Sequence, residues 1–247
     1  MLYALLIGVA FLAGAQNALA GGGSFLTFPA LLAAGLGARA ANITSTVALF
    51  PGQVATGWFG RAHVAGLPGL SVRTLAVISL GGGAAGAVLL LNTSEAVFQR
   101  LVPFLVLFAT AAFAWGSFFR KPDAGRVRLP RAASAAMQFV IAVYGGYFGG
   151  GIGILLIAAL SLAGQGVRTA GATKNALNAI LNSAAVLIFA FSRDVRWDAC
   201  LAVAVGAIAG GQAGTWLLLR VDDRLLRLVV VGIGLSLTAA MFIKVYL

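Results

Sequence analysis

The chain has 247 residues, of which 61% are hydrophobic and only 9% are charged. A soluble domain carries roughly 25% charged residues, so this composition leaves too little polar surface to cover a globule and excludes a soluble fold. Residues 1–38 and residues 132–167 carry no charge, and each run exceeds the roughly 20 apolar residues that cross a bilayer. The composition predicts an all-α, multi-pass integral membrane protein.

The basic excess fits the same interpretation. Lys and Arg together number 17 against 6 Asp and Glu, which gives a net charge of +11. Membrane proteins collect Lys and Arg in cytoplasmic loops, so we expect no nucleic acid as a partner. The lone Cys200 and the lone His63 leave no material for an internal disulfide or a His-rich metal site. We therefore expect no metal and no cofactor.

Hydropathy, together with punctuation by Gly, Pro and charged residues, predicts about eight transmembrane segments. They cover residues 2–35, 40–60, 71–91, 97–119, 132–163, 169–191, 197–219 and 225–246. The first segment contains Ala18-Leu19-Ala20, which imitates the cleavage site of a signal peptide, but no Lys or Arg precedes its apolar run. We interpret it as a retained first membrane helix.

The most hydrophilic connection, residues 120–131, lies near the middle of the chain. Its charged residues are Arg120, Lys121, Asp123, Arg126, Arg128 and Arg131. It separates a first membrane repeat, residues 1–119, from a second, residues 132–247. By the positive-inside rule this basic linker is predicted to be cytoplasmic.

The two halves resemble each other in sequence. Residues 22–45 align without gaps on residues 151–174. The matched pairs are Gly22 and Gly151, Gly35 and Gly164, Gly37 and Gly166, Arg39 and Arg168, and Thr44 and Thr173. Farther along, Gly82, Gly83 and Gly86 align with Gly210, Gly211 and Gly214. Chance agreement of Gly and Ala is easy in such a composition, whereas agreement of Arg and Thr is not, so we predict two homologous four-segment repeats.

The relative orientation of the repeats depends on the first segment of each half, which is too long for a plain helix. Four crossings per half keep the halves parallel, whereas an odd number inverts one of them. Residues 2–20 nearly span alone, which leaves residues 24–35 as a half-length piece that either crosses or is re-entrant. If all eight segments cross, both termini are cytoplasmic and Arg39 lies on the opposite side from Arg193.

Glycine clusters interrupt the first segment of both halves, at residues 21–23 and 149–153. Each Gly destabilises a helix by about 1 kcal/mol relative to Ala, so we predict that the first helix of each repeat is broken there. Paired breaks are the best sequence pointer to a transporter's substrate site, and the N–H groups at the start of the following helix attract anions. The alternative is that these glycines only permit close helix packing.

Glycines four residues apart favour packing over binding. They are Gly82 and Gly86 in the first half and Gly206, Gly210 and Gly214 in the second. Small residues at this spacing let membrane helices approach closely, so we assign these glycines to helix packing.

A polar stripe runs along residues 169–191. On a helix, Lys174, Asn178 and Asn182 share one face at i, i+4 and i+8, with Asn175 beside them. A charge inside a membrane segment is costly and by default marks a functional site, so we expect Lys174 to bind an anion. Two alternatives stay open, because polar side chains also join membrane helices and because Lys174 is close enough to the segment's end to snorkel to the interface. The aligned polar residues of the first half are Thr44, Ser45, Thr46 and Gln53.

Enzyme signatures are absent from the sequence. Neither HExxH nor GxSxG occurs. The adjacent acidic pair Asp222-Asp223 lies among Arg220, Arg224 and Arg227, as expected for a solvated turn. We therefore expect no enzyme and no catalytic residue.

The motifs at both breaks resemble those of a known family. Residues 21–31, GGGSFLTFPAL, are similar to the glycine-rich, proline-ending opening of the TauE/SafE sulfite exporter family, and residues 172–183 look like the matching motif of its second half. The resemblance covers essentially the whole chain and departs from the pattern at Ala158, which aligns with Pro29. It implies a permease for small anions such as sulfite or organosulfonates in a bacterial or archaeal inner membrane.

We therefore predict a secondary transporter that carries a small sulfur-containing or organic anion and is driven by an ion gradient, with proton and sodium both open. An anion channel and a non-transporting membrane subunit of a larger complex are the alternatives. The predicted substrate-binding residues are Gly22, Gly23, Ser24, Thr27, Thr44, Ser45, Gln53, Gly150, Gly151, Gly153, Thr173, Lys174, Asn175, Asn178 and Asn182.

Overall fold

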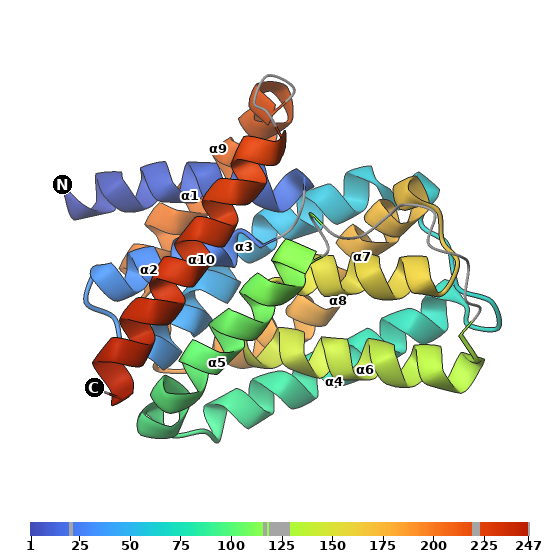
Figure 1. Ribbon diagram of the computed structural model, residues 1–247, viewed down its shortest axis with the longest axis horizontal. Helices are drawn as coiled ribbons and strands as arrows, with labels where there is room; N and C mark the ends of the chain where they lie inside the picture. Colours follow the sequence, from blue (N-terminus) through green and yellow to red (C-terminus); the bar gives the residue numbers. More distant parts are fainter. Residues whose placement is uncertain (20–21, 116–117, 119–128, 219–222, 247) are drawn as a thin grey trace.

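The computed structural model is all-helical in the part of the chain that it describes, namely residues 1–19, 22–115, 118, 129–218 and 223–246 (Figure 1). These ranges hold ten α-helices and a short 3-10 helix, and their only strand-like feature is an isolated bridge between Leu67 and Leu70. The α-helices are α1 Leu2–Leu19, α2 Ser24–Ala33, α3 Ala38–Phe59, α4 Val72–Leu91, α5 Glu95–Ala114, α6 Arg131–Tyr147, α7 Ile152–Leu162, α8 Val167–Phe189, α9 Trp197–Leu218 and α10 Asp223–Tyr246. The all-α prediction is confirmed.

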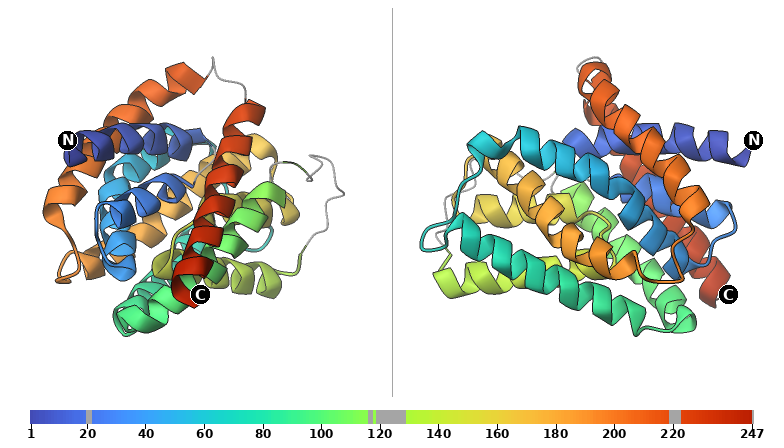
Figure 2. Two further views of the ribbon diagram at one scale, coloured as in Figure 1. Left: turned by 60° about the vertical axis from the view of Figure 1, so that its left-hand side comes forward. Right: turned by 180° about the vertical axis from the view of Figure 1, so that it is seen from behind.

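The predicted first segment of each half contains two helices. Residues 2–35 form α1 and α2, and residues 132–163 form α6 and α7. In each pair the second helix turns back beside the first (Figures 1 and 2). A Cβ atom added at Gly23 would lie 2.6 Å from the carbonyl oxygen of Ala13, and one added at Gly145 would collide with Ile152. Each pair is therefore a tightly packed hairpin.

The short second helix of each pair ends in the same way. α2 is followed by Gly35 at φ 90° and α7 by Gly164 at φ 97°. The next N–H then donates to a carbonyl five residues earlier, from Leu36 to Leu31 and from Gln165 to Leu160. This is the Schellman arrangement, for which a left-handed Gly carries no Cβ penalty.

Most of the closest helix pairs join a helix of the first half to a helix of the second half. α1 lies along α9 and α4 lies along α6, while α3 packs against α8 and α5 against α10. Cβ atoms added at Gly82 and Gly86 would collide with α6, and those at Gly206 and Gly210 with the backbone of α1. The packing prediction is confirmed for these four glycines. The surroundings of Gly214 lie outside the described part of the structure.

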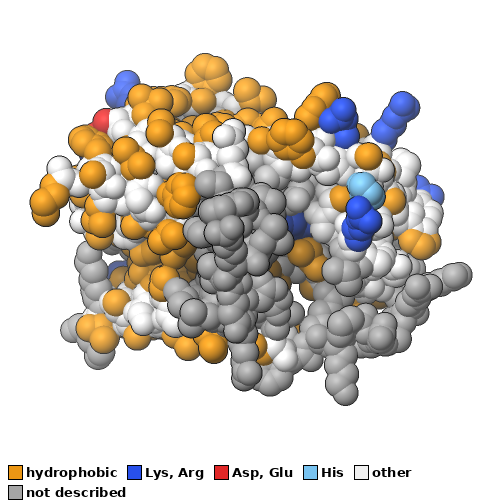
Figure 3. All heavy atoms as spheres, turned by 90° about the horizontal axis from the view of Figure 1, so that it is seen from above, with side chains coloured by type: hydrophobic (Ala, Val, Ile, Leu, Met, Phe, Trp, Pro, Cys, Tyr) orange, Lys and Arg blue, Asp and Glu red, His pale blue; other side chains and the backbone are white. Residues whose placement is uncertain are grey.

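The outer surface is largely apolar. α4 and α5 are each long and apolar enough to cross a membrane, with mean hydropathies of 2.0 and 1.8. Large side chains such as Phe59 and Phe191 are 84% and 90% exposed. Hydrophobic side chains cover much of the face in Figure 3, and most of its Lys and Arg side chains lie toward the ends. A bilayer would cover such a surface, because lipid tails solvate apolar side chains and water does not.

Three turns lie together at one end of the molecule. Arg39 at the start of α3 forms an ion pair with Asp194 at 3.1 Å, and its backbone N–H donates to Glu95. The α8–α9 turn, which also holds Arg193, therefore lies at the same end as the start of α3. The arrangement in which all eight segments cross put Arg39 and Arg193 on opposite sides and is wrong, because the α1–α2 and α6–α7 hairpins turn back. Residues 120–128 of the predicted linker lie outside the described residues.

Candidate functional site

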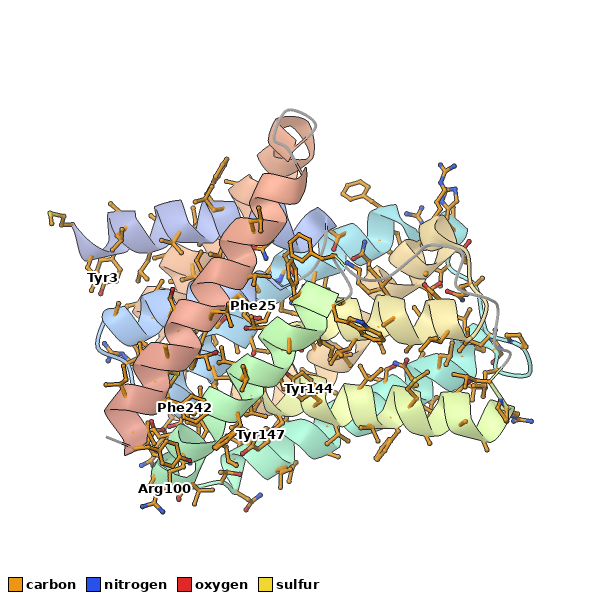
Figure 4. All side chains as sticks on the ribbon, in the orientation of Figure 1. Tyr3, Phe25, Arg100, Tyr144, Tyr147 and Phe242 are labelled. Atoms are coloured by element: carbon orange, nitrogen blue, oxygen red, sulfur yellow. The ribbon has the colours of Figure 1, made fainter. Side chains whose placement is uncertain are left out.

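The two glycine turns face each other inside the molecule. A cavity of about 10 Å³ lies between them, which is roughly the room that one water molecule needs. Ser24 and Phe25 reach it from the start of α2, and Phe148 and Gly150 reach it from the turn before α7. Its other lining residues are Phe28, Asn42, Val106 and Leu237. Figure 4 shows Phe25 within the helical body, away from the end that holds Tyr3 and Arg100.

The turn before α7 leaves backbone donors free. Gly149 and Gly151 have φ values of 75° and 70°, a region that favours Gly. The Tyr144 hydroxyl donates to the Gly150 carbonyl at 2.9 Å, which fixes the turn against α6. Among the described residues, the N–H groups of residues 150–153 have no hydrogen-bond acceptor. Such a helix start carries a partial positive charge and suits an anion.

The turn before α2 also joins the two helices of a hairpin, but its hydrogen bonds differ from those of the turn before α7. Gly22 has φ 90°, and its carbonyl accepts from the N–H of Phe25 at 2.9 Å. The hydroxyls of Thr27 and Ser45 lie 2.6 Å apart and share a hydrogen bond. A Cβ added at Gly151 would lie 3.4 Å from the Phe25 ring. The ring therefore separates the two turns.

Asn42 is a cavity residue that the sequence interpretation missed. Its side-chain amide donates to the carbonyl of Tyr147 at 3.0 Å and is buried, so it ties α3 to the end of α6. The repeat alignment gave no signal, because Asn42 aligns with Gly171. Phe148 was missed for a different reason, since an aromatic residue in an apolar run looks like ordinary core.

The polar stripe of α8 faces the protein interior. Lys174 is only 2% exposed, so the snorkelling alternative is wrong. Asn182 donates from Nδ2 to Gln53 Oε1 of α3 at 2.7 Å and to Asn178 Oδ1 at 3.3 Å. Among the described side chains, no acidic group forms a salt bridge with Lys174. Arg168, one turn and a half earlier, is exposed.

Two threonines of the predicted site hold loops. Thr44 accepts a hydrogen bond from the backbone N–H of Arg196, and Thr173 accepts one from the N–H of Ala65, both at 3.1 Å. Each bond joins a helix of one half to a loop of the other half. These hydroxyls therefore stabilise the contact between halves. Asn175 is half-buried beside the stripe.

Apart from Thr44 and Thr173, which hold loops, and the hydrogen-bonded pair Thr27 and Ser45, the predicted residues fall into two groups. Ser24 and Gly150 line the cavity, Gly22, Gly23 and Gly151 lie in the adjoining turns, and Gly153 lies in the first turn of α7. The second group is the α8 stripe with Gln53 of α3. The lining of the cavity between the glycine turns includes residues of the first group and none of the second.

Comparison with known proteins assigns the chain to a family. The family model of the sulfite exporter TauE/SafE matches residues 6–241. The chain belongs to the TauE/SafE family. The family match covers the glycine turns, the α8 stripe and both halves.

Bacterial relatives of this TauE/SafE protein carry transporter names. It is 29% identical over 241 residues to the probable membrane transporter protein YfcA of Escherichia coli (strain K12), covering 97% of this chain and 89% of the relative. It is 28% identical over 246 residues to a probable membrane transporter protein of Haemophilus influenzae, covering 97% and 94%. For the probable membrane transporter protein ORF9 of Sinorhizobium sp the values are 31% over 246 residues, 96% and 91%. No solved structure matches the chain.

The predicted permease is confirmed at the level of the family. The TauE/SafE protein is a membrane transporter that works in a lipid environment on a small molecule. The family and the names of its relatives describe transport and no enzymatic reaction.

Proposed function

We propose that this protein is a secondary transporter for a small sulfur-containing or organic anion, such as sulfite or an organosulfonate, in a bacterial or archaeal inner membrane. The observation that carries the proposal is Lys174, a cation that is 2% exposed and has no acidic partner among the described residues. A buried charge is costly unless it is paired, and a bound anion supplies the pair. The free N–H groups before α7 favour the same sign of charge.

The proposed repeats are related by inversion. Gln53 and Asn182 are 129 positions apart, the spacing that also relates Gly22 to Gly151, and they are hydrogen-bonded to each other. Equivalent residues meet in this way only near the axis that relates two halves. We assign six membrane crossings to α3, α4, α5, α8, α9 and α10, with the α1–α2 and α6–α7 hairpins entering from opposite sides. Inverted repeats around a central site are typical of secondary transporters.

Transport requires the centre to open. The cavity between the glycine turns has about 10 Å³, which is room for about one water and not for an oxyanion with several heavy atoms. The rings of Phe25 and Phe148 line this cavity, and the Phe25 ring lies 3.4 Å from a Cβ added at Gly151. Movement of these rings would enlarge the cavity between the glycine turns. The coupling ion, proton or sodium, is identified by imposing each gradient alone.

Counterflow in liposomes tests the function. Purified protein is reconstituted with unlabelled sulfite inside and a trace of labelled sulfite outside, and the same is done with methanesulfonate and acetate. A secondary transporter accumulates label faster when substrate is present on the far side. Label entry without this stimulation indicates the channel, and no entry above protein-free liposomes indicates the non-transporting subunit. Either result overturns the proposal.

Cysteine labelling tests the orientation. In a Cys200→Ala background, Asp123→Cys in the basic linker should react only with membrane-permeant reagents in intact cells. Asn92→Cys lies in the turn after α4, at the end that holds Arg39 and both termini (Figure 1), and should react with impermeant reagents. The reversed pattern overturns the orientation, and equal labelling of both sites overturns the inverted arrangement.

A further inference from the structure

Gln16 near the end of α1 is a buried polar side chain without a partner. It is 1% exposed, and neither Nε2 nor Oε1 has a hydrogen-bond partner among the residues that the structure describes. Leaving both ends of a buried carboxamide unpaired is destabilising, and native proteins keep few such groups. The group therefore needs an explanation outside the unliganded fold.

The position of Gln16 supplies that explanation. A Cβ atom added at Gly22 would lie 3.5 Å from Gln16 Nε2, so the carboxamide lies against the glycine turn that opens α2. α2 has ten residues and begins at Ser24, and a helix start attracts negative charge. The same Cβ would lie 3.1 Å from the ring of Phe25, which lines the central cavity. The unpaired amide and the start of α2 thus lie on one side of the Phe25 ring.

The second half fills the equivalent space with apolar side chains. Gln16 aligns with Gly145, where an added Cβ would collide with Ile152 and lie 3.0 Å from Leu181. The residues that align with Ile152 and Leu181 are Gly23 and Gly52. One half therefore carries two bulky apolar side chains and no amide, and the other carries an amide and two glycines.

A second cavity lies beside Gly52, one of these two glycines of the first half. Gly52 lines this cavity of about 10 Å³ between α1, α3 and α9, together with Asn17 and Thr56. Its other lining residues are Gly14, Leu49, Ala207 and Gly211. The first half thus combines unpaired polar atoms at Gln16 with open space beside Gly52, whereas an added Cβ at Gly145 in the second half meets Ile152 and Leu181.

We propose that Gln16 is a substrate-contacting residue that binds the oxygens of an oxyanion at the start of α2. Nε2 donates to the anion, and Oε1 accepts from an O–H group or a water that enters with it. This inference rests on the proposed function and adds a neutral, directional contact to the charge of Lys174. It makes the first half the part of the site that distinguishes oxyanions from other anions.

The test compares Gln16→Leu with Gln138→Leu in the purified full-length protein. Gln138 is a matched control, because it is 2% exposed but donates to Ser79 Oγ at 2.8 Å. Sulfite, methanesulfonate and chloride serve as probes at equal ionic strength, with the thermal midpoint and Kd as readouts. Gln16→Leu should raise the midpoint of the unliganded protein and weaken oxyanion binding about threefold to tenfold, the range of a neutral hydrogen bond. Gln138→Leu should lower the midpoint and leave Kd unchanged.

The outcomes separate this inference from the proposed function. If Gln16→Leu binds the oxyanions as tightly as the wild-type protein and has a lower thermal midpoint, Gln16 has a structural role. That result overturns this inference and leaves the proposed function standing. A wild-type protein that binds and transports none of the oxyanions overturns the proposed function and the inference with it. Gln16→Met, which keeps the length of the side chain, replaces the Leu variant if that protein does not fold, and the same criteria then apply.

Discussion

α3 and α8 have matched polar positions but different charges. Thr44 and Thr173 each accept a backbone N–H from a loop of the other half at 3.1 Å. At the next position, Ser45 shares a hydrogen bond with Thr27, whereas Lys174 is buried without an acidic partner among the described residues. Thr44 and Thr173 hold the halves together. Lys174, which differs from its counterpart Ser45, is a buried charge that no described acidic group balances. Among these polar positions, Lys174 is therefore the one that we expect to contact the anion.

The largest expected effect concerns a feature that both halves share, the glycine turns. Gly151→Leu and Gly23→Leu should each abolish transport with the protein still present in the membrane. Gly151 has φ 70°, a conformation that is strained for residues with a Cβ atom, and a side chain at Gly23 would meet the Ala13 carbonyl. Gly8→Leu is the control, because no atom lies within 4 Å of an added Cβ there. Unchanged affinity in both variants would return the glycines to the packing interpretation.

The next effect is expected in one half only. Lys174→Ala should weaken binding about tenfold to a hundredfold, because a hydrogen bond to a charged group contributes roughly 1.5–3 kcal/mol. Lys174→Arg should retain part of the affinity, since the charge survives while the donor geometry changes. Ser45→Ala at the aligned position should cost less than about threefold, as its hydroxyl is already bonded to Thr27. Equal losses at Lys174 and Ser45, measured by titration calorimetry, would contradict the asymmetry.

A smaller effect tests the contact between equivalent residues. Gln53→Leu or Asn182→Leu alone should destabilise the fold by about 1–3 kcal/mol. Gln53→Leu leaves Asn182 Nδ2 with only its 3.3 Å bond to Asn178, and Asn182→Leu removes the donor to the buried Gln53 Oε1. The double variant should lose less than the sum of the two, since both polar groups are removed together. Thermal unfolding of the four proteins in a double-mutant cycle measures the coupling. Additive losses would mean that the two amides do not depend on each other.

The smallest effects are expected for the aligned arginines. Arg39→Ala breaks the ion pair with Asp194 and should cost about 0.2–1 kcal/mol of stability, as is usual for a partly exposed pair. Arg168→Ala removes an exposed side chain and should change stability by less than about 0.5 kcal/mol. Both should bind substrate normally in the same titration. If Arg168→Ala loses substrate binding while Lys174→Ala binds substrate normally, the anion site lies at the arginines of the short loops and not at Lys174.

Composition and periodicity predicted the helices, the packing glycines and the polar face of α8, because each leaves a regular pattern in the sequence. The direction of α2 was not predictable, since hydropathy reports length and not whether a chain turns back at Gly22. The inward direction of Lys174 was open for a related reason, as a lysine near a helix end has both choices. Asn42 and Gln16 were missed because each is an isolated polar residue whose importance depends on neighbours distant in sequence.

The bond between Gln53 and Asn182 has a mechanical consequence. If the two halves trade conformations when the protein changes its open side, every contact between non-equivalent residues is exchanged for its counterpart. A contact between equivalent residues is its own counterpart, so it is the same before and after. The 2.7 Å bond between Asn182 and Gln53 would then stay in place while the two halves rotate about it. The loops that Thr44 and Thr173 hold would move in opposite directions on either side of this bond.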